Sequence, residues 1–407
     1  MLDPTPQPER RPELDWLRAG AVLLVLFFHT GMMFVSWPWV VKSPVRSQVL
    51  ELVMGWLHWW RMPLLLFVSG AGTFLAMRRR SPGAFLAERS RRLLLPFAFG
   101  CFVIVPPQIY VERIEEYRTF WEFYPTVFEL VPYPQGGSLS FHHLWFVLYL
   151  FLYSVAFLPL LLWLRSPRAD PFFDRLARLG ERRFGSLLWL VPLVGSQLVL
   201  GPWWPQDTLG LVGDYAALAR YGLFFLAGFL FARDPRLWEA ACRERHRNLA
   251  VSGLAAAALF ASGLVRVRPT WFGWDAMCGI PALVLGWSTV LAIVGWAQVH
   301  LTRGGPLLRY ATEAVYPFYI LHQTVIVILG YQVVRWRGGL WGNYLLICGG
   351  SFVATMAIHH LAVRPFALTR FLFGLKARQT GAASRRVEDL TPPSIPRSTR
   401  VIASAAE

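Results

Sequence analysis

The chain has 407 residues, of which 55% are hydrophobic and 16% are charged, and its formal net charge is +16. Soluble domains carry roughly 25% charged residues, so the composition excludes an ordinary soluble domain and predicts an all-α, polytopic membrane protein. The basic residues lie between apolar runs and do not form one face, which argues against nucleic acid as a partner. The four cysteines are scattered and include no CxxC pair, so we expect neither a zinc site nor a disulfide scaffold, and no bound metal.

Ten apolar runs are long enough to cross a bilayer, which takes about 18 residues. If the N-terminus is cytoplasmic, the cytoplasmic segments between the spans carry 30 lysines and arginines and the external segments carry 8. This asymmetry predicts about ten transmembrane helices with both termini in the cytoplasm. The first run lacks a signal-peptide cleavage site and should remain as a span. The predicted spans are 19–36, 52–76, 93–110, 144–164, 186–202, 209–231, 249–265, 276–299, 312–334 and 340–363.

The first predicted span contains an ionisable residue, His29, and is preceded by Asp15 and Arg18. Arg18 and His29 are eleven positions apart, so they share a helix face and lie about 16 Å apart along the axis. Arg18 can therefore sit at the cytoplasmic surface, paired with Asp15, while His29 lies near mid-bilayer. Ionisable groups within a span are usually functional. His29 either acts in catalysis or hydrogen-bonds a neighbouring helix; Arg18 either binds a ligand or sets orientation.

A loop with six arginines, residues 78–92, follows the second span. Arg89 and Arg92 are spaced as RxxR, at helical spacing, just before the third span. Guanidinium groups bind phosphates bidentately, so the pair suits a nucleotide-containing donor such as coenzyme A. The alternative is the general bias of cytoplasmic loops toward basic residues, together with anionic lipid headgroups.

Small residues occupy the middle of the second span, in the run Ser69, Gly70, Ala71 and Gly72. Such residues let helices approach closely, and packing is the favoured interpretation. The functional alternative is that Ser69 and its neighbours leave room for an acyl chain or a pantetheine arm.

Two further polar clusters lie at or within predicted spans. Tyr319 and His322, in "YPFYILHQ", are one turn apart and either line a cavity or form a satisfied interfacial pair. His143 and Trp145, in "HHLWF", enter the fourth span from outside. Trp145 suits an aromatic belt, and His143 could face an acceptor.

The order of these motifs resembles the acyltransferase 3 family of integral membrane O-acyltransferases, and most closely its glucan biosynthesis protein C branch. The resemblance covers about residues 13–373. It depends on Arg18-x10-His29, "MPLLLFVSG", "RSRRLLLPFAFG" with "VPPQIY", "HLWF" and "YPFYILHQ", in this order. The HxxxxD motif of other acyltransferases is absent, as are GxSxG and HExxH.

The resemblance implies an acyltransferase 3 transmembrane domain 19–373, and the charge distribution places a cytoplasmic segment 1–18 before it. Residues 374–407 are rich in Ser, Thr, Pro and Arg, which predicts a disordered cytoplasmic tail. It implies a multi-pass protein of the bacterial inner membrane, with no bound cofactor and with acyl-CoA as co-substrate. An acetyl or succinyl group would pass to a hydroxyl of an extracytoplasmic glycan or glycolipid. We do not expect the hydrolase-like domain that some relatives carry, which leaves open whether the chain completes the transfer alone or passes the acyl group to an extracytoplasmic partner protein.

Carried onto matching positions, His29 becomes the catalytic histidine with Arg18 as its motif partner, and Arg89 and Arg92 become donor-binding residues. His29 would act as general base or as transient acyl carrier. Tyr319 and His322 match a late motif. Arg61 and Arg220, both within spans, are candidate partners for a succinyl carboxylate. The alternative function is a multi-span transporter or lipid-binding protein without acyl chemistry.

Overall fold

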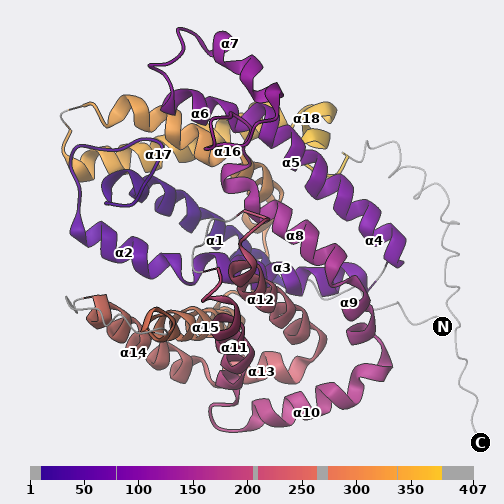
Figure 1. The fold of residues 1–407 in the computed structure, drawn as a ribbon. Coiled ribbons are helices and arrows are strands. Elements are labelled where there is room, and N and C mark those ends of the chain that lie inside the picture. The colour runs from indigo at the N-terminus through magenta and orange to yellow at the C-terminus, as the bar shows by residue number, and fades with distance from the viewer. Residues whose placement is uncertain (1–10, 79, 205–209, 264–273, 337, 378–407) are drawn as a thin grey trace, which may run out of the picture.

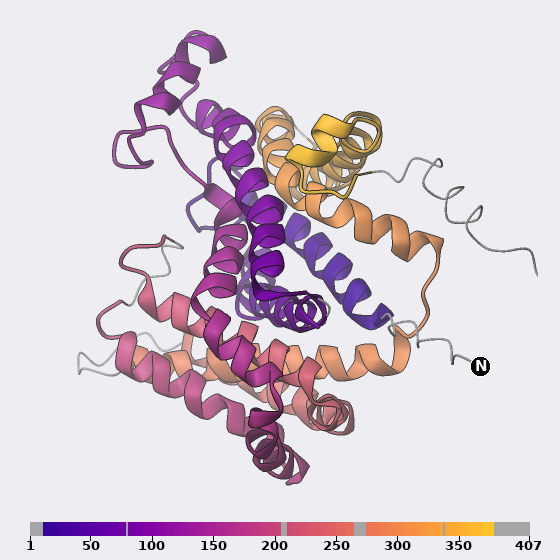
Figure 2. The ribbon, with the colours of Figure 1, turned by 90° about the vertical axis from the view of Figure 1, so that its right-hand side faces the viewer.

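The computed structural model describes residues 11–78, 80–204, 210–263, 274–336 and 338–377. These residues form a bundle of helices in which α1 packs between α16 and α3, and α3 packs along α12 (Figure 1). Turning the molecule by 90° shows the α16–α17 pair on one side of α1 and the α15 layer on the other (Figure 2). The first half of the described chain contains α1 (Pro12–Gly31), α2 (Gln48–His58), α3 (Arg61–Met77), α4 (Pro82–Arg89), α5 (Leu95–Phe99), α6 (Pro106–Glu112), α7 (Phe120–Phe123), α8 (Trp145–Ala156) and α9 (Leu158–Arg165).

The second half begins with an amphipathic helix and ends with a short one against α5. Its helices are α10 (Asp170–Glu181), α11 (Leu190–Leu200), α12 (Tyr215–Arg233), α13 (Pro235–Arg243), α14 (Arg245–Gly263), α15 (Trp274–His300), α16 (Pro306–Val333), α17 (Leu340–Ile358) and α18 (Ala367–Leu372). Three five-residue π-helical segments interrupt the spans: η2 (Ser90–Leu94), η3 (Gly100–Ile104) and η8 (His359–Val363). Short 3-10 turns η1 (Met32–Phe34), η4 (Tyr124–Glu129), η5 (His142–Leu144), η6 (Pro167–Ala169) and η7 (Gly185–Trp189) join the rest.

Seven helices among the described residues are long and apolar enough to cross a membrane. They are Pro12–Phe34, Gln48–Met77, Pro82–Glu112, Tyr215–Arg233, Gly279–His300, Pro306–Val333 and Leu340–Val363. An eighth candidate is the pair His142–Ala156 and Leu158–Arg165, bent by 62°. The remaining predicted spans fall on the shorter apolar helix Gly185–Leu200 and on α14. The all-α, multi-pass prediction is confirmed, whereas ten spans and cytoplasmic termini stay predictions.

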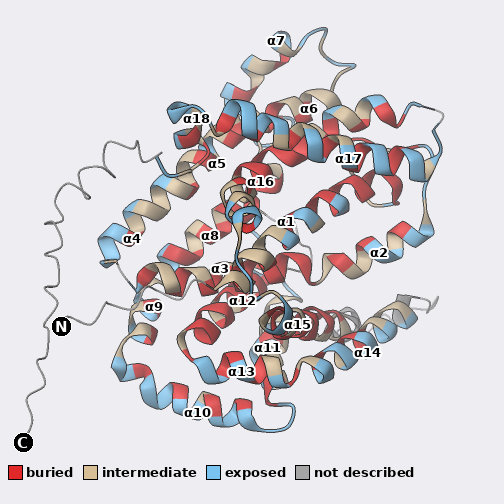
Figure 3. Ribbon diagram, turned by 180° about the vertical axis from the view of Figure 1, so that it is seen from behind, coloured by how far each residue is buried: buried red, intermediate tan, exposed pale blue. Residues whose placement is uncertain are grey.

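Large apolar side chains are exposed along the outer faces of these helices, as expected where lipid replaces water. Phe27 of α1, Leu345 and Val353 of α17 and Leu254 of α14 are 41%, 64%, 66% and 73% exposed, respectively. Viewed from behind, buried residues are concentrated on α3, α12 and α16 at the centre of the bundle (Figure 3). An outward apolar surface around a buried interior is the arrangement a bilayer requires.

Glycines bring α3 and α12 into backbone contact. A Cβ at Gly70 would lie 1.9 Å from the Phe225 carbonyl oxygen, and one at Gly228 would lie 1.8 Å from the Phe67 carbonyl oxygen. No side chain fits in either place, so the packing interpretation of the 69–72 run holds for Gly70. This close contact fixes the position of α3, which carries residues of the site at both ends.

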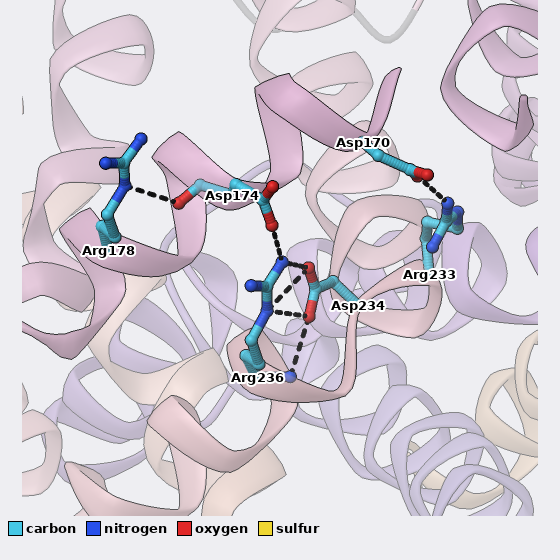
Figure 4. A network of polar contacts seen from close by, with 6 residues as sticks. All are labelled: Asp170, Asp174, Arg178, Arg233, Asp234 and Arg236. Carbon is cyan, nitrogen blue, oxygen red and sulfur yellow. Dashed lines mark hydrogen bonds and ion pairs between the residues drawn. The ribbon is translucent and has the colours of Figure 1, made fainter. Parts of the chain in front are cut away.

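An ion-pair network joins α10 to α13 at the arginine-rich edge of the bundle (Figure 4). Arg236 bonds Asp174 at 2.9 Å and Asp234 at 2.7 Å, and Arg233 bonds Asp170 at 2.6 Å. Asp234 also caps α13 by accepting the Arg236 backbone N–H. The two carboxylates raise the pKa of Arg236, so this guanidinium stays charged at every physiological pH. The network holds two surface helices together away from the site.

Candidate functional site

A cavity of about 610 Å³ opens between α1, α3, α4, η2, α8 and α16. Seven basic side chains and two carboxylates line it, a net formal charge of +5. They come from segments far apart in the chain: Arg18, Arg80, Glu88, Arg89, Arg92, Arg309, Glu313, Arg370 and Lys376. Such a concentration of guanidinium groups in a concave site suits a multiply charged anion such as a phosphate.

The two carboxylates take up four of the nearby arginines. Glu88 pairs with Arg80 at 2.7 Å and with Arg92 at 3.4 Å. Glu313 pairs with Arg370 at 2.7 Å and with Arg364 at 3.3 Å. These pairs hold the side chains in place around the cavity mouth.

The remaining cations at the mouth are less fully neutralised. Arg18 lies 3.5 Å from Asp15, which confirms the expected pairing. Arg89 donates from Nη2 to the hydroxyl of Thr73 at 2.7 Å, a neutral partner from α3. A guanidinium held by a neutral hydroxyl keeps its charge available for a ligand. Arg89 thus lines the cavity without a carboxylate ion-pair partner among the described residues.

Away from the arginines, the cavity becomes apolar. Val22 of α1, Leu65 of α3, and Phe146 and Leu150 of α8 line this part, with Tyr316 and Tyr319 of α16. Ser69 and Gly72 line it from α3. A Cβ atom at Gly72 would lie 3.0 Å from Nη2 of Arg18, so glycine leaves room for this guanidinium. A cavity with both basic and apolar lining residues suits a ligand with a charged head and an uncharged arm.

Three histidines meet one helical turn past Tyr319. His29 of α1 lies against His322 of α16, with Nδ1 3.0 Å from Nε2 and the rings stacked at 5.1 Å. His143 of η5 stands edge-on to His322, with ring centroids 5.3 Å apart. The three histidines are more than 100 positions apart in the sequence. They meet because α1, η5 and α16 come together at this point in the fold.

Hydrogen-bond partners fix the tautomers of this cluster. The Tyr319 carbonyl can only accept, so His322 Nδ1, 2.6 Å away, donates to it. With both rings neutral, His322 Nε2 is then an acceptor and His29 Nδ1 donates to it. His29 Nε2 is left with a free lone pair. His29 also keeps 9% of its surface exposed, against 0% for His322.

His143 is held in the same way by α16. Its Nε2 donates to the Ile320 carbonyl at 3.0 Å, and the Tyr319 hydroxyl donates to the His143 carbonyl. The buried Nδ1 of His143 has no partner among the described residues. Its lone pair is a second unfilled acceptor beside His322.

Tyr319 separates the cavity from the histidines. Its ring lies 5.6 Å from Phe146, 5.8 Å from His143 and 5.7 Å from His322, and it lines the cavity. The three imidazoles do not line the cavity themselves. The His29 ring also lies 5.2 Å from that of Trp39 and 5.8 Å from that of Phe28.

The sequence-predicted residues therefore fall into three groups. Arg18, Ser69, Arg89, Arg92 and Tyr319 line the cavity, and His29, His143 and His322 form the cluster behind it. Trp145 belongs to neither, since it is buried between the rings of Tyr149 and Tyr221, 5.1 Å and 5.2 Å away.

Sequence reasoning did not single out several lining residues. Arg80 belongs to the recognised arginine loop, but Arg309, Arg370 and Lys376 stand singly in the chain and carry no motif. Residues 374–376 begin the segment predicted as a tail, and they form part of the cavity wall; residues 378–407 lie outside the described part of the chain.

The fold and cavity define a polytopic membrane protein with a basic internal site. Residues 11–360 match the model of the acyltransferase 3 family, described as "Acyltransferase domain", and the chain belongs to this family of membrane acyltransferases. The resemblance inferred from the motifs is thus confirmed, and acyl transfer is favoured over the transporter alternative.

Relatives with the same printed name come from several Salmonella strains. The chain is 24% identical over 378 residues to "Glucans biosynthesis protein C" of Salmonella paratyphi A, Salmonella agona and Salmonella dublin. Each alignment covers 89% of this chain and 94% of the relative. No solved structure matches the chain.

Proposed function

We propose that this acyltransferase moves an acetyl or succinyl group from cytoplasmic acyl-CoA to a hydroxyl of an extracytoplasmic glycan, with His29 as the catalytic base. The observation that carries the proposal is the hydrogen-bonded chain from the Tyr319 carbonyl through His322 to His29, next to the end of a basic cavity. The chain leaves one imidazole nitrogen unprotonated behind Tyr319, which lines the cavity.

The donor would bind with its phosphates at the mouth. Arg18, Arg89 and Arg92 line this part, and Arg89 is bonded only to a hydroxyl there. The uncharged pantetheine arm of coenzyme A would then lie along Ser69 and Leu65. Coenzyme A is a cytoplasmic metabolite, so this orientation requires the arginine-rich side to be cytoplasmic, as the distribution of lysine and arginine predicts.

In the reaction, His29 Nε2 removes the proton of the acceptor hydroxyl as its oxygen attacks the thioester carbonyl carbon. The tetrahedral intermediate collapses, the C–S bond breaks, and the thiolate takes the proton from the His29 imidazolium. His322 holds His29 in the required tautomer throughout. If His29 carries the acyl group transiently instead, the same Nε2 lone pair is the nucleophile.

The acceptor is proposed from the relatives, whose name refers to glucan biosynthesis. A glucan hydroxyl would approach from the side of His143, which enters α8 from the predicted outer surface. Its free Nδ1 lone pair can accept a hydrogen bond from a sugar hydroxyl. At this outer surface of the bacterial inner membrane, the enzyme would bind a periplasmic glucan directly. Alternatively, it would bind a partner protein that completes the transfer.

The test is transfer of a labelled acyl group from acyl-CoA to a glucan by the full chain in lipid nanodiscs. His29→Ala should lower kcat at least 100-fold, because general-base catalysis contributes typically 10²–10⁴-fold. The matched control is His246→Ala, an exposed histidine that packs on Trp296. A folded His29→Ala protein that keeps most of its activity refutes the assignment.

A further inference from the structure

A buried arginine, Arg61, lies close to the histidine cluster. Arg61 is the first residue of α3, directly after the break between α2 and α3, and only 7% of it is exposed. Its guanidinium carbon lies 3.3 Å from the centre of the Phe28 ring. Phe28 immediately precedes His29, and their rings are 5.8 Å apart.

The hydrogen-bonding groups of this arginine are not satisfied. Nε and Nη1 of Arg61 are both buried and have no partner among the described residues, and no carboxylate forms an ion pair with it there. A cation–π contact compensates only part of the cost of burying a charge. These buried N–H groups are therefore free to donate to a ligand.

Trp39 adds a third unused donor. Its ring lies 5.2 Å from that of His29, and its buried Nε1–H has no partner among the described residues. Around the His29 ring and its neighbour Phe28 there are thus three buried N–H donors without a partner among the described residues, two of them on a cation. Hydrogen-bond donors that are held in place without an acceptor can stabilise an oxygen atom that becomes negative during the reaction.

We propose that Arg61, with Trp39, forms the oxyanion-binding site of this acyltransferase. The inference rests on the proposed function. As the acceptor oxygen bonds to the thioester carbon, the carbonyl π electrons move to the carbonyl oxygen, which becomes the oxyanion. Arg61 Nε–H and Nη1–H and Trp39 Nε1–H then donate to it. When the C=O bond re-forms, the C–S bond breaks and the thiolate receives the proton held by His29.

The position of Arg61 favours this oxygen over the other negative groups of a donor. The phosphates belong at the opposite end of the cavity, beside Arg18 and Arg89. A terminal carboxylate on the acyl chain would be several bonds away from the reacting carbon. Since His29 Nε2 must reach the attacking hydroxyl, the carbonyl oxygen is the negative atom that lies nearest to His29.

The experiment measures kcat and donor KM for Arg61→Met and Arg61→Lys in nanodiscs, with one acyl donor that bears a terminal carboxylate and one that does not. Loss of an oxyanion donor lowers kcat by about 10²–10³-fold. We expect that loss with both donors, with donor KM changed less than about threefold. Guanidinium ion added to Arg61→Ala should restore part of the rate. Trp39→Phe, which keeps the ring, should lower kcat about tenfold.

The control is Arg335→Met, because Arg335 also stacks on an aromatic ring, that of Tyr331 at 4.0 Å, but is exposed. It should keep wild-type kcat. An Arg61→Met protein that melts normally and keeps its kcat overturns the proposal, and so does a defect confined to the carboxylate-bearing donor. If the wild-type chain itself transfers no acyl group, the proposed function fails instead.

Discussion

His322→Leu should separate orientation of the catalytic base from binding of the donor. His322 is fully buried and accepts the Nδ1–H of His29 at 3.0 Å, which fixes the tautomer that leaves Nε2 free. Leucine fills a similar volume but leaves that N–H unsatisfied, at a cost of about 1–3 kcal/mol. Because 1.36 kcal/mol is a factor of ten in rate, kcat should fall about 5- to 150-fold.

Steady-state kinetics with labelled acyl-CoA checks this result. The donor KM should change little, since no cavity-mouth arginine contacts His322. His322→Gln should recover part of kcat, because its amide oxygen can accept the same N–H. The control is His359→Leu, another fully buried histidine, whose ring nitrogens have no partner in the described structure. If His322→Leu stays within twofold of the wild-type kcat, His322 does not orient His29.

Three further predictions test the donor site and the packing. Arg89→Met should raise the acyl-CoA KM about 10- to 100-fold at nearly constant kcat, because a charge-assisted bond contributes about 1.5–3 kcal/mol; an unchanged KM in the same kinetics would exclude phosphate binding by Arg89. Gly70→Ala should lower the melting temperature sharply, since its Cβ would lie 1.9 Å from the Phe225 carbonyl oxygen, whereas Gly55→Ala, with open space around it, should not. Asp174→Ala should change the free energy of unfolding by less than about 1 kcal/mol, because its ion pair with Arg236 is exposed. Thermal or denaturant unfolding measures this change, and a larger value would show that the α10–α13 network is cooperative.

The span pattern could be predicted from sequence because hydropathy is a local property. Eight of the predicted spans correspond to long apolar helices or to the bent pair around Phe157. Hydropathy did not reveal the bend itself, nor the break at Trp59 and Trp60 that places Arg61 at a helix start. Those depend on how neighbouring helices pack against each segment.

The shared face of Arg18 and His29 followed from helical periodicity, yet the structure gives the two residues different surroundings. Arg18 lines the cavity, whereas His29 lies behind Tyr319 and bonds to His322. Periodicity fixes only the direction in which a side chain leaves its helix. What it meets there is decided by the partner helix.

By itself, the sequence determined that the chain is a helical membrane protein, which family motifs it carries, and which single residues are chemically capable of acyl transfer. Composition, periodicity and motif spacing are properties of the chain alone. Only the tertiary structure paired His29 with His322, added Arg309 and Lys376 to the basic cavity, and left two buried N–H groups of Arg61 without a hydrogen-bond partner in the described part of the chain. The physical reason is that hydrogen bonds and charge interactions act over a few ångströms in space, and this fold brings residues about 290 positions apart within that distance.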